Sequence, residues 1–598
     1  MSTSVSQVYN NNIDKNILSG TKYSRRIKFV GTIRVLLFIT FLIVFVYLIN
    51  ARELSFALLS FAIFIALFIG LVRQFNKFTK ERTLHRSMLK INELELERLN
   101  NNFGRIDNGQ EFIDESHSYS QDIDVFGDHS LFQLLNRTST IKGKQLLANR
   151  LTGGELPTEP KEYHTAVKEL SMMLDFTQKY EGIGKEVKSS EEDFNQFELW
   201  LSEPNILSSK RSLKILLYLL PAIFLIGLLT AYLLSITYYT LLPVLIINGI
   251  LIGKYHKRTS QVVEKTSASV GLLKSYVAHL DLLAEMKFKS SFLNELKNKL
   301  ENESADARKT IRQLASLLEQ LQVRTNMLHI FINIPLLLDL QWLFRLSSWK
   351  SENADSIRRW IDSLAEFEVL NSMAGLAFMF PHWSFPALEQ TEFEIDGLEL
   401  GHPLINQQNR ITNDIMLKGA GNAVIITGPN MAGKSTFLRT VATNMVLAQA
   451  GSPVCASSFV LSQNLRVFTA MRTHDNLSEN VSSFYAELER IKQLLELVKE
   501  GNKVIYFLDE LLKGTNSSDR HRGAQALIKQ LIALGVTGFV STHDIELGEM
   551  TQELQNVSNY SFESDIIEGR INFDYKIREG VCSSFNASEL MRQMGIQV

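Results

Sequence analysis

Hydrophobic residues gather in a few long uncharged runs along the chain. Residues 35–49 are apolar apart from Thr40, and residues 54–72 and 215–253 carry no charged side chain. About 20 apolar residues cross the hydrocarbon core of a bilayer as a helix, so the longest run is sufficient for two spans, 215–234 and 241–253. The pattern predicts two transmembrane helical hairpins, at 29–72 and 213–253.

Basic residues flank both predicted hairpins, whereas the two connecting turns contain Arg52 alone. The flanking residues are Lys22, Arg25, Arg26, Lys28, Arg73, Lys77, Lys80, Arg82, Lys210, Arg211, Lys214, Lys254, Lys257 and Arg258. By the positive-inside rule, both termini and the region between the hairpins are expected in the cytoplasm, with the chain integral to the cytoplasmic membrane. Buried core helices of a large soluble protein are the alternative. It is disfavoured because run lengths and charge flanks agree.

The remaining N-terminal two thirds has mostly helical periodicity. A long exposed helix is expected at 75–102, an acidic linker at 107–129, a helix-turn-helix element at 130–151 and further helices over 262–346. Leu314, Leu317, Leu318 and Leu321 define one apolar helix face. Residues 327–344 are apolar but contain polar positions, and they favour a packed core helix over a fifth span.

From about residue 397, short β-rich runs alternate with helices, which predicts an α/β domain with a mainly parallel sheet. The expected fold class is thus α plus α/β. The chain has 598 residues, 45% of them hydrophobic, which excludes a disordered protein and indicates several domains. Two cysteines exclude a disulfide scaffold and fit a reducing compartment. A net charge of −2 gives no general sign of nucleic-acid binding.

A phosphate-binding motif follows the first predicted strand of this domain, 423–427. It has the form G-x-x-x-x-G-K-[ST] and lies between a strand and a predicted helix at 437–448, as its mechanism requires. Its residues are Gly428, Pro429, Asn430, Met431, Ala432, Gly433, Lys434, Ser435 and Thr436. Backbone N–H groups of such a loop bind phosphates, while Lys434 is expected at the β- and γ-phosphates of ATP and Ser435 on Mg²⁺.

Two further predicted strands end in polar residues. The run 504–508 leads to Asp509, expected near the Mg²⁺, and to Glu510, expected to hold or deprotonate the attacking water. The run 536–540 leads to His543, expected to donate a hydrogen bond near the γ-phosphate. Parallel strands bring such ends to one edge of a sheet, so the sequence predicts ATP hydrolysis there.

The motifs together resemble the MutS family of ATPases. The P-loop with Phe437-Leu438-Arg439, the segment 475–487, Asp509 to Thr515, Ser541-Thr542-His543, His402-Pro403 and Asn413-Asp414 are all similar to family motifs. The family usually has Gly where this chain has Ala432. Residues 131–151 and 364–370 look like the start and end of the family's helical core, so the resemblance covers roughly 128–205 and 255–598.

The resemblance implies a homodimer through the ATPase domains, with one chain completing the other's site. Ser482 and Ser483 are then expected to face the partner's γ-phosphate, near Asn480 and Val481, which stand where the family has Gly and Arg. The family's aromatic contact to adenine falls on Arg410 or Ile411. DNA binding is a further implication. The family's mismatch-reading and connector domains have no counterpart in residues 73–127.

Together these features predict seven regions. They are a cytoplasmic tail (1–28), hairpin 1 (29–72), a helix and acidic linker (73–127), the first part of a MutS-like core (128–212), hairpin 2 (213–253), the second part with levers (254–390) and the P-loop, ABC-type ATPase domain (391–598). The expected function is a membrane-anchored MutS-like ATPase that moves its helical levers. The alternatives are the ATPase of an ABC-type transporter, whose Leu-Ser-Gly-Gly-Gln motif is missing, and a nucleotide-switched membrane scaffold.

Overall fold

The computed structural model describes residues 4–187, 190–204, 211–301, 306–325, 329–472, 483–567 and 570–582. The chain divides into two compact units. The helical unit comprises Met1–Glu93, Arg137–Gln145 and Asp175–Val369. The sheet unit comprises Leu94–Asn136, Leu146–Leu174 and Leu370–Val598.

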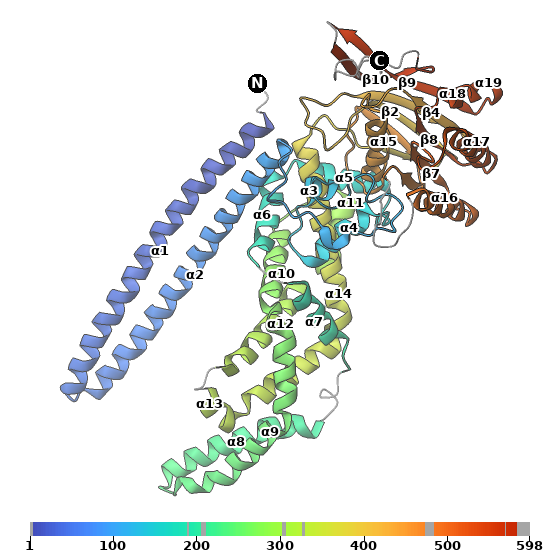
Figure 1. Ribbon diagram of the computed structural model, residues 1–598. Coiled ribbons are helices and arrows are strands. Elements are labelled where there is room, and N and C mark those ends of the chain that lie inside the picture. The colour runs from blue at the N-terminus through green and yellow to red at the C-terminus, as the bar shows by residue number, and fades with distance from the viewer. Residues whose placement is uncertain are drawn as a thin grey trace. The chain divides into compact units, whose positions relative to one another are not determined.

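Two long helices begin the helical unit. Helices α1 (Val5–Asn50) and α2 (Leu54–Leu99) run side by side as an antiparallel hairpin (Figure 1). Phe41 stacks on Phe64 with ring centroids 4.2 Å apart, and the side chains of Asn16 and His85 are hydrogen-bonded at 2.7 Å. The predicted tail at 1–28 is therefore largely a continuation of the first helix. Most large apolar side chains between residues 35 and 69 remain exposed.

The second predicted hairpin is also helical. Helix α8 (Arg211–Leu233) and helix α9 (Leu242–Thr266) are joined through the 3-10 turn η2 (Tyr238–Leu241). Four helices of the described chain are long and apolar enough to cross a membrane by length and composition. They coincide with the four predicted spans, and α9 continues beyond residue 253 into a basic segment.

Most of the helical unit is a bundle that follows the predicted periodicity. Its members are α6 (Leu174–Lys185), α7 (Glu191–Ser202), α10 (Ser269–Ala284), α11 (Ser291–Glu301), α12 (Ala307–Gln322) and η3 (Val323–Thr325). On α12, Leu314, Leu318 and Leu321 are buried and Leu317 is half-buried, which confirms the predicted apolar face.

The expectation of a single packed helix at 327–344 is wrong. The structure has α13 (His329–Leu336) and α14 (Leu338–Met379), bent by 70° at Leu337, whose φ is 54°. Pro335 lacks an N–H and disfavours continuation of the helix. Phe331 on α13 is 72% exposed, so this helix is not core on that face. At the bend, the Asp339 carboxylate accepts a hydrogen bond from the Asn333 side chain and pairs with His329, and the backbone N–H of Asp339 donates to Asn333.

A buried carboxylate joins two segments that are far apart in the sequence. Glu368 on α14 accepts hydrogen bonds from the backbone N–H and hydroxyl groups of both Ser139 and Thr140, at 3.0 to 3.1 Å. Burial raises the pKa of this carboxyl group, and the four donors oppose that rise. The two segments expected to begin and end a helical core therefore meet at this carboxylate.

The sheet unit contains two sheets and short helices. The helices are η1 (Gln110–Phe112), α3 (Leu131–Leu135), α4 (Ile141–Leu151, shared with the helical unit), α5 (Pro160–Ser171), α15 (Lys434–Gln449), α16 (Ser483–Lys499), α17 (Ser517–Ala533), α18 (Ile545–Gly548) and α19 (Met550–Glu553). The strands are β1 (Ala387–Glu389), β2 (Glu394–Leu400), β3 (Asn413–Lys418), β4 (Ala423–Thr427), β5 (Ser458–Ser462), β6 (Arg466–Ala470), β7 (Val504–Asp509), β8 (Thr537–Thr542), β9 (Val557–Ile567) and β10 (Arg570–Glu579).

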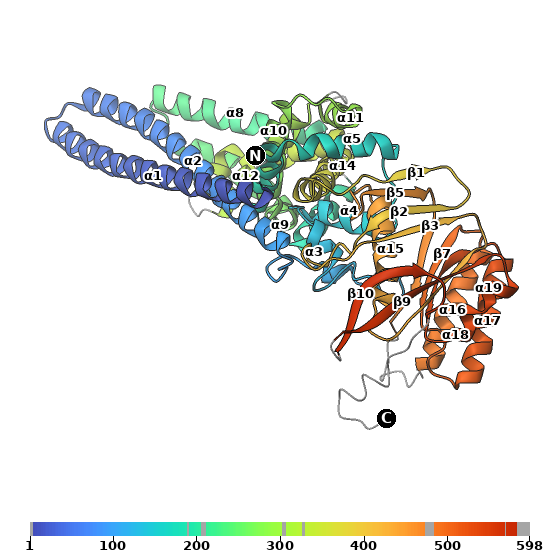
Figure 2. The ribbon, with the colours of Figure 1, turned by 90° about the horizontal axis from the view of Figure 1, so that it is seen from above.

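The larger sheet has the order β10-β9-β4-β8-β7-β6 and is parallel except at β10, which confirms the predicted α/β arrangement. Helix α15 packs against β7 and β8 and also against β2 of the smaller sheet, β1-β5-β2-β3. Helices α16, α17 and α18 gather on the opposite side of the larger sheet (Figure 2), where Leu494, Ile528 and Leu547 join its buried core. The layers leave the carboxyl ends of β4, β7 and β8 at one edge.

Candidate nucleotide site

The loop after β4 has the backbone conformation of a phosphate-binding loop. Gly428 and Gly433 have φ angles of 148° and 109°, and Met431 has a φ of 66°. A Cβ atom at Gly428 would lie 2.6 Å from the carbonyl oxygen of Phe562, so only glycine fits there. Gly433 caps α15, whose first N–H groups and positive dipole end face the loop.

Lys434 is the buried cation of this loop. Its Nζ donates to the carbonyl oxygens of Gly428 (2.9 Å) and Pro429 (3.0 Å) and lies 3.5 Å from the His543 ring nitrogens. Burial lowers the pKa of the ammonium, while Glu510 and Asp509 raise it. An anion bound in the loop would stabilise the charged form of Lys434 and so offset the cost of burying it. Lys434 is therefore suited to bind phosphate.

The carboxyl end of β7 supplies two acidic groups. Asp509 accepts a hydrogen bond from the hydroxyl of Ser541 at the end of β8. The backbone N–H of Glu510 donates to the carbonyl of Ser541 at 3.0 Å, and Glu510 has a φ of 52°. This left-handed conformation turns the chain sharply at the strand end, so the two carboxylates take different directions.

Glu510 is held by two cationic or potentially cationic side chains. Its Oε1 lies 2.5 Å from Nε2 of His543, and its Oε2 lies 3.2 Å from Nζ of Lys513. The hydrogen bond from His543, together with the charge of Lys513, lowers the pKa of Glu510 to about 2, against the opposing effect of burial. The carboxylate is therefore ionised throughout the physiological range.

The structure brings together the residues predicted from three separate strand ends. In the sheet register Thr427 is opposite Thr542, and Ser541 is opposite Asp509, so the P-loop, the acidic pair and His543 share one edge. The loop offers N–H groups and an ammonium to phosphates. Ser435 and Asp509 carry oxygen donors, a hydroxyl and a carboxylate, of the kind that Mg²⁺ prefers. The residues present thus fit a nucleoside triphosphate with its divalent cation.

The expected contribution from a second chain falls mostly outside the described residues. Ser482, Asn480 and Val481 lie outside them, and for Ser483 the structure describes only its place at the start of α16. Later on this helix, Glu487 accepts a hydrogen bond from the backbone N–H of Lys513 at 3.1 Å. The family-like segment is therefore tied to the loop that carries Glu510.

Several contacts at this site were not predicted from the sequence. Lys513 was not assigned a role, although its spacing of three residues after Glu510 is a signal for pairing. The acidic segment 107–129, expected as a linker, is part of the sheet unit and is hydrogen-bonded to the end of β6 and the residues after it. There Asp122 accepts hydrogen bonds from the Thr469 hydroxyl (2.6 Å) and from the backbone N–H groups of Met471 (3.1 Å) and Arg472 (2.9 Å).

The other family-like residues have structural contacts. Asn413 donates to the carbonyl of Tyr575 and accepts from the backbone N–H of Ile577. Arg410 donates to the carbonyl of Ile405 and lies over the ring of Trp383 at 5.4 Å. Arg410 is thus engaged within the fold, whereas Ile411 is 43% exposed.

A strand, a glycine-rich loop that caps a helix, and an acidic pair at the end of another parallel strand of the same sheet define the class of P-loop nucleotide-binding domains. Residues 424–595 match the family model of MutS domain V. This part of the chain, which contains the phosphate-binding loop and the acidic pair, is therefore similar to MutS domain V.

Named relatives also match part of the chain. The DNA mismatch repair protein MutS of Thermotoga maritima is 32% identical over 237 residues, covering 39% of this chain and 29% of that protein. The DNA mismatch repair protein MSH4 of Arabidopsis thaliana is 31% identical over 215 residues, covering 36% of this chain and 27% of that protein. The chain therefore spans less than a third of the length of these relatives.

Proposed function

We propose that this chain is a membrane-anchored MutS-type ATPase that binds and hydrolyses ATP at the carboxyl edge of its larger sheet. This proposal rests on one observation: three strand ends bring together Lys434, Asp509, Glu510 and His543. Phosphoryl transfer needs positioning and charge stabilisation more than covalent chemistry, and this edge offers both.

Each of these side chains has a separate role in the proposed hydrolysis. Lys434 and the loop N–H groups bind the β- and γ-phosphates and stabilise charge on the transferred group. Ser435 and Asp509 would hold Mg²⁺, which neutralises phosphate charge when bound. A carboxylate with a pKa of about 2 is a weak base, so Glu510 acts mainly by accepting a hydrogen bond from water and orienting it. His543 holds Glu510 and lies beside Lys434.

The active form proposed here is a homodimer in which the segment 475–487 of one chain completes the site of the other. The contact between Glu487 and Lys513 supports this, because it connects that segment's helix to the loop of Glu510. A partner that engages the segment would thereby act on the catalytic loop. Helix α14 includes residues of both units, so it is the proposed lever.

ATP hydrolysis by the purified full chain tests the site. Lys434→Ala should lower ATP binding and hydrolysis about 100-fold, since it removes the buried cation that faces the phosphates. Glu510→Gln should retain ATP binding but lose turnover, and ATP should then hold it as a dimer in light scattering. Glu496→Gln, at an exposed position on α16, is the matched control. Absence of hydrolysis in the unaltered chain would favour the scaffold alternative instead.

Membrane integration is supported by the four long apolar helices and their basic flanks. We propose that both hairpins cross the cytoplasmic membrane, with the ATPase and both termini in the cytoplasm. The chain should stay in the membrane fraction after an alkaline carbonate wash. Release into the supernatant would contradict the anchoring.

DNA is proposed as a further partner on the strength of the relatives' names alone. Binding of duplex, branched and mismatched DNA across a salt series would test it, because phosphate contacts produce a steep salt dependence. An absence of salt-dependent affinity for all three would remove DNA from the proposal without affecting the ATPase.

A further inference from the structure

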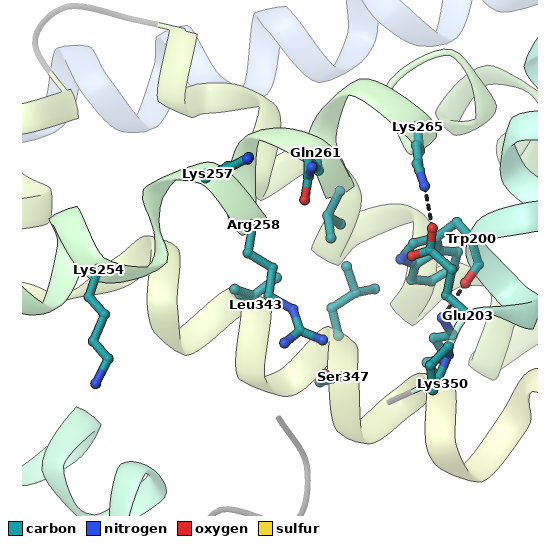
Figure 3. Close-up of a pocket in the computed structure, with 13 residues that line it drawn as sticks. Trp200, Glu203, Lys254, Lys257, Arg258, Gln261, Lys265, Leu343, Ser347 and Lys350 are labelled. Atoms are coloured by element: carbon teal, nitrogen blue, oxygen red, sulfur yellow. Dashed lines mark hydrogen bonds and ion pairs between the residues drawn. The ribbon is translucent and has the colours of Figure 1, made fainter. Parts of the chain in front are cut away.

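A basic recess lies within the helical unit, and none of its lining residues belongs to the nucleotide site. It has a volume of about 520 Å³ and is formed by three chain segments, the end of α7, the second half of α9 and the first third of α14. Its lining residues are Trp200, Glu203, Pro204, Lys254, Lys257, Arg258, Gln261, Val262, Lys265, Leu343, Leu346, Ser347 and Lys350. Figure 3 shows Arg258 extending from α9 towards Leu343 and Ser347 on α14.

Positive charge dominates this lining. Five of the lining residues are Lys or Arg, and Glu203 is the single acid among them. Glu203 forms an ion pair with Lys265, marked in Figure 3. Among the described residues, no carboxylate pairs with Lys254, Lys257 or Arg258. The recess therefore has several cations without counter-charges, an arrangement that attracts an anion.

Lys350 places one of these cations in a buried position. Its side chain donates to the carbonyl of Trp200, and its Nζ lies 4.9 Å from the centre of the Trp200 ring. The residue is 7% exposed. Its pKa is lowered by burial and by the nearby charges of Arg258 and Lys265, against the opposing effect of Glu203. An anion in the recess would offset this repulsion.

The lining also has an apolar part. Leu343 and Leu346 are buried on α14, and the ring of Trp200 adds a broad apolar surface. Lys254 directly follows the proposed span 241–253, so the same helix passes from an apolar stretch to the basic lining within one turn. An apolar surface next to a cationic one suits a molecule with an anionic head and apolar chains better than a fully hydrated ion.

We propose that this recess binds the phosphate headgroup of an anionic phospholipid at the cytoplasmic face of the membrane. Arg258 and Lys254 contact the phosphate, Lys350 adds long-range attraction, and the acyl chains follow the apolar part of α9. Basic pockets at the cytoplasmic ends of transmembrane helices are suited to such headgroups, since that leaflet is the anionic one. The assignment rests on the membrane anchoring proposed above.

Binding of added lipid to the delipidated full chain in detergent tests the site. Native mass spectrometry should show phosphatidylglycerol retained with at least tenfold preference over phosphatidylcholine, because the latter headgroup has no net charge. The double variant K254Q/R258Q should lose about tenfold in phosphatidylglycerol affinity. The matched control K287Q/K309Q removes two exposed cations of the same unit that do not line the recess, and it should bind as the unaltered chain does.

Three results would overturn the proposal. They are equal retention of both lipids, undiminished phosphatidylglycerol binding by K254Q/R258Q, and complete displacement of the lipid by 10 mM inorganic phosphate, which would indicate a site for free phosphate. A carbonate wash separates this failure from failure of the anchoring. If the chain stays in the membrane while lipid selectivity is absent, the headgroup site alone is wrong. If the chain is washed out of the membrane, both the membrane anchoring and the headgroup site are contradicted.

Discussion

The candidate nucleotide site and the basic recess both present groups that attract phosphate, but the groups differ in kind. At the nucleotide site, a contiguous loop supplies backbone N–H groups and a single buried lysine, Lys434, held by the loop's own carbonyls. In the recess, side chains from two separate helices, α9 and α14, supply the charge, and little of it is neutralised. Backbone donors fix the geometry of a ligand, whereas side-chain cations mainly supply attraction.

This difference predicts unequal tolerance to change. A backbone site depends on conformation, so one added methyl group can abolish it. A side-chain site depends on summed charge, so each substitution should weaken it by a limited factor. Four predictions test this contrast.

The largest effect is expected from Gly428→Ala. The added Cβ would lie 2.6 Å from the Phe562 carbonyl oxygen, and a φ of 148° is unfavourable for alanine. ATP affinity, measured by fluorescent-nucleotide titration, should fall about 100-fold or more. Gly501→Ala is the control, because that glycine also has a positive φ (81°) but has no neighbouring atom within 4 Å of its Cβ position. Equal effects from both substitutions would contradict a specific role for the loop conformation.

The second-largest effect is expected from Lys350→Met, which removes the buried charge of the recess but retains an unbranched side chain. Phosphatidylglycerol affinity should fall about threefold, less than in K254Q/R258Q, because Lys350 attracts the phosphate without contacting it. Because the surroundings lower the pKa of this lysine, removal of the charge should leave the melting temperature almost unchanged. Lys350→Arg retains the charge and should retain the affinity. A loss of affinity with arginine as well would indicate a packing role instead.

A smaller difference is expected from salt. The Debye length falls from about 10 Å at 0.1 M to about 3 Å at 1 M, and exposed charges are screened more than buried ones. Raising NaCl from about 50 to 500 mM should weaken phosphatidylglycerol binding severalfold and ATP binding less. The same titrations at constant Mg²⁺ provide both values. A steeper salt dependence for ATP would reverse the comparison.

The smallest effect concerns the pH dependence of stability. The pKa of Glu510 is about 2, below the ordinary value near 4.3, so its ionised form stabilises the folded state above the ordinary pKa. This contribution is lost as pH falls from about 5 towards 2. The melting temperature of the unaltered chain, relative to Glu510→Gln, should therefore fall by a few degrees between pH 6 and pH 3.5. A constant difference would mean that the contacts with His543 and Lys513 do not lower the pKa of Glu510.

Parts of both regions could be predicted from local sequence. The strand before Gly428, the loop and the acidic pair after β7 were placed correctly because each is a contiguous pattern in which neighbouring residues share one element. The helical hairpins were predicted for the same reason, since a long apolar run defines a long helix. The break at Leu337 was missed, although Pro335 was visible, because an apolar run alone does not show where a helix bends.

The sequence by itself determined the elements, the order of the P-loop motifs and the runs of apolar and basic residues, because these depend on neighbours along the chain. Only the tertiary structure decided that Glu368 meets Ser139 and Thr140, that His543 and Lys513 hold Glu510, and that Trp200, Arg258 and Lys350 line one recess. Except for the pair of Glu510 and Lys513, which are three residues apart, these contacts join residues far apart in the sequence. They arise from the packing of separate helices and strands, which leaves no periodic or contiguous pattern in the chain.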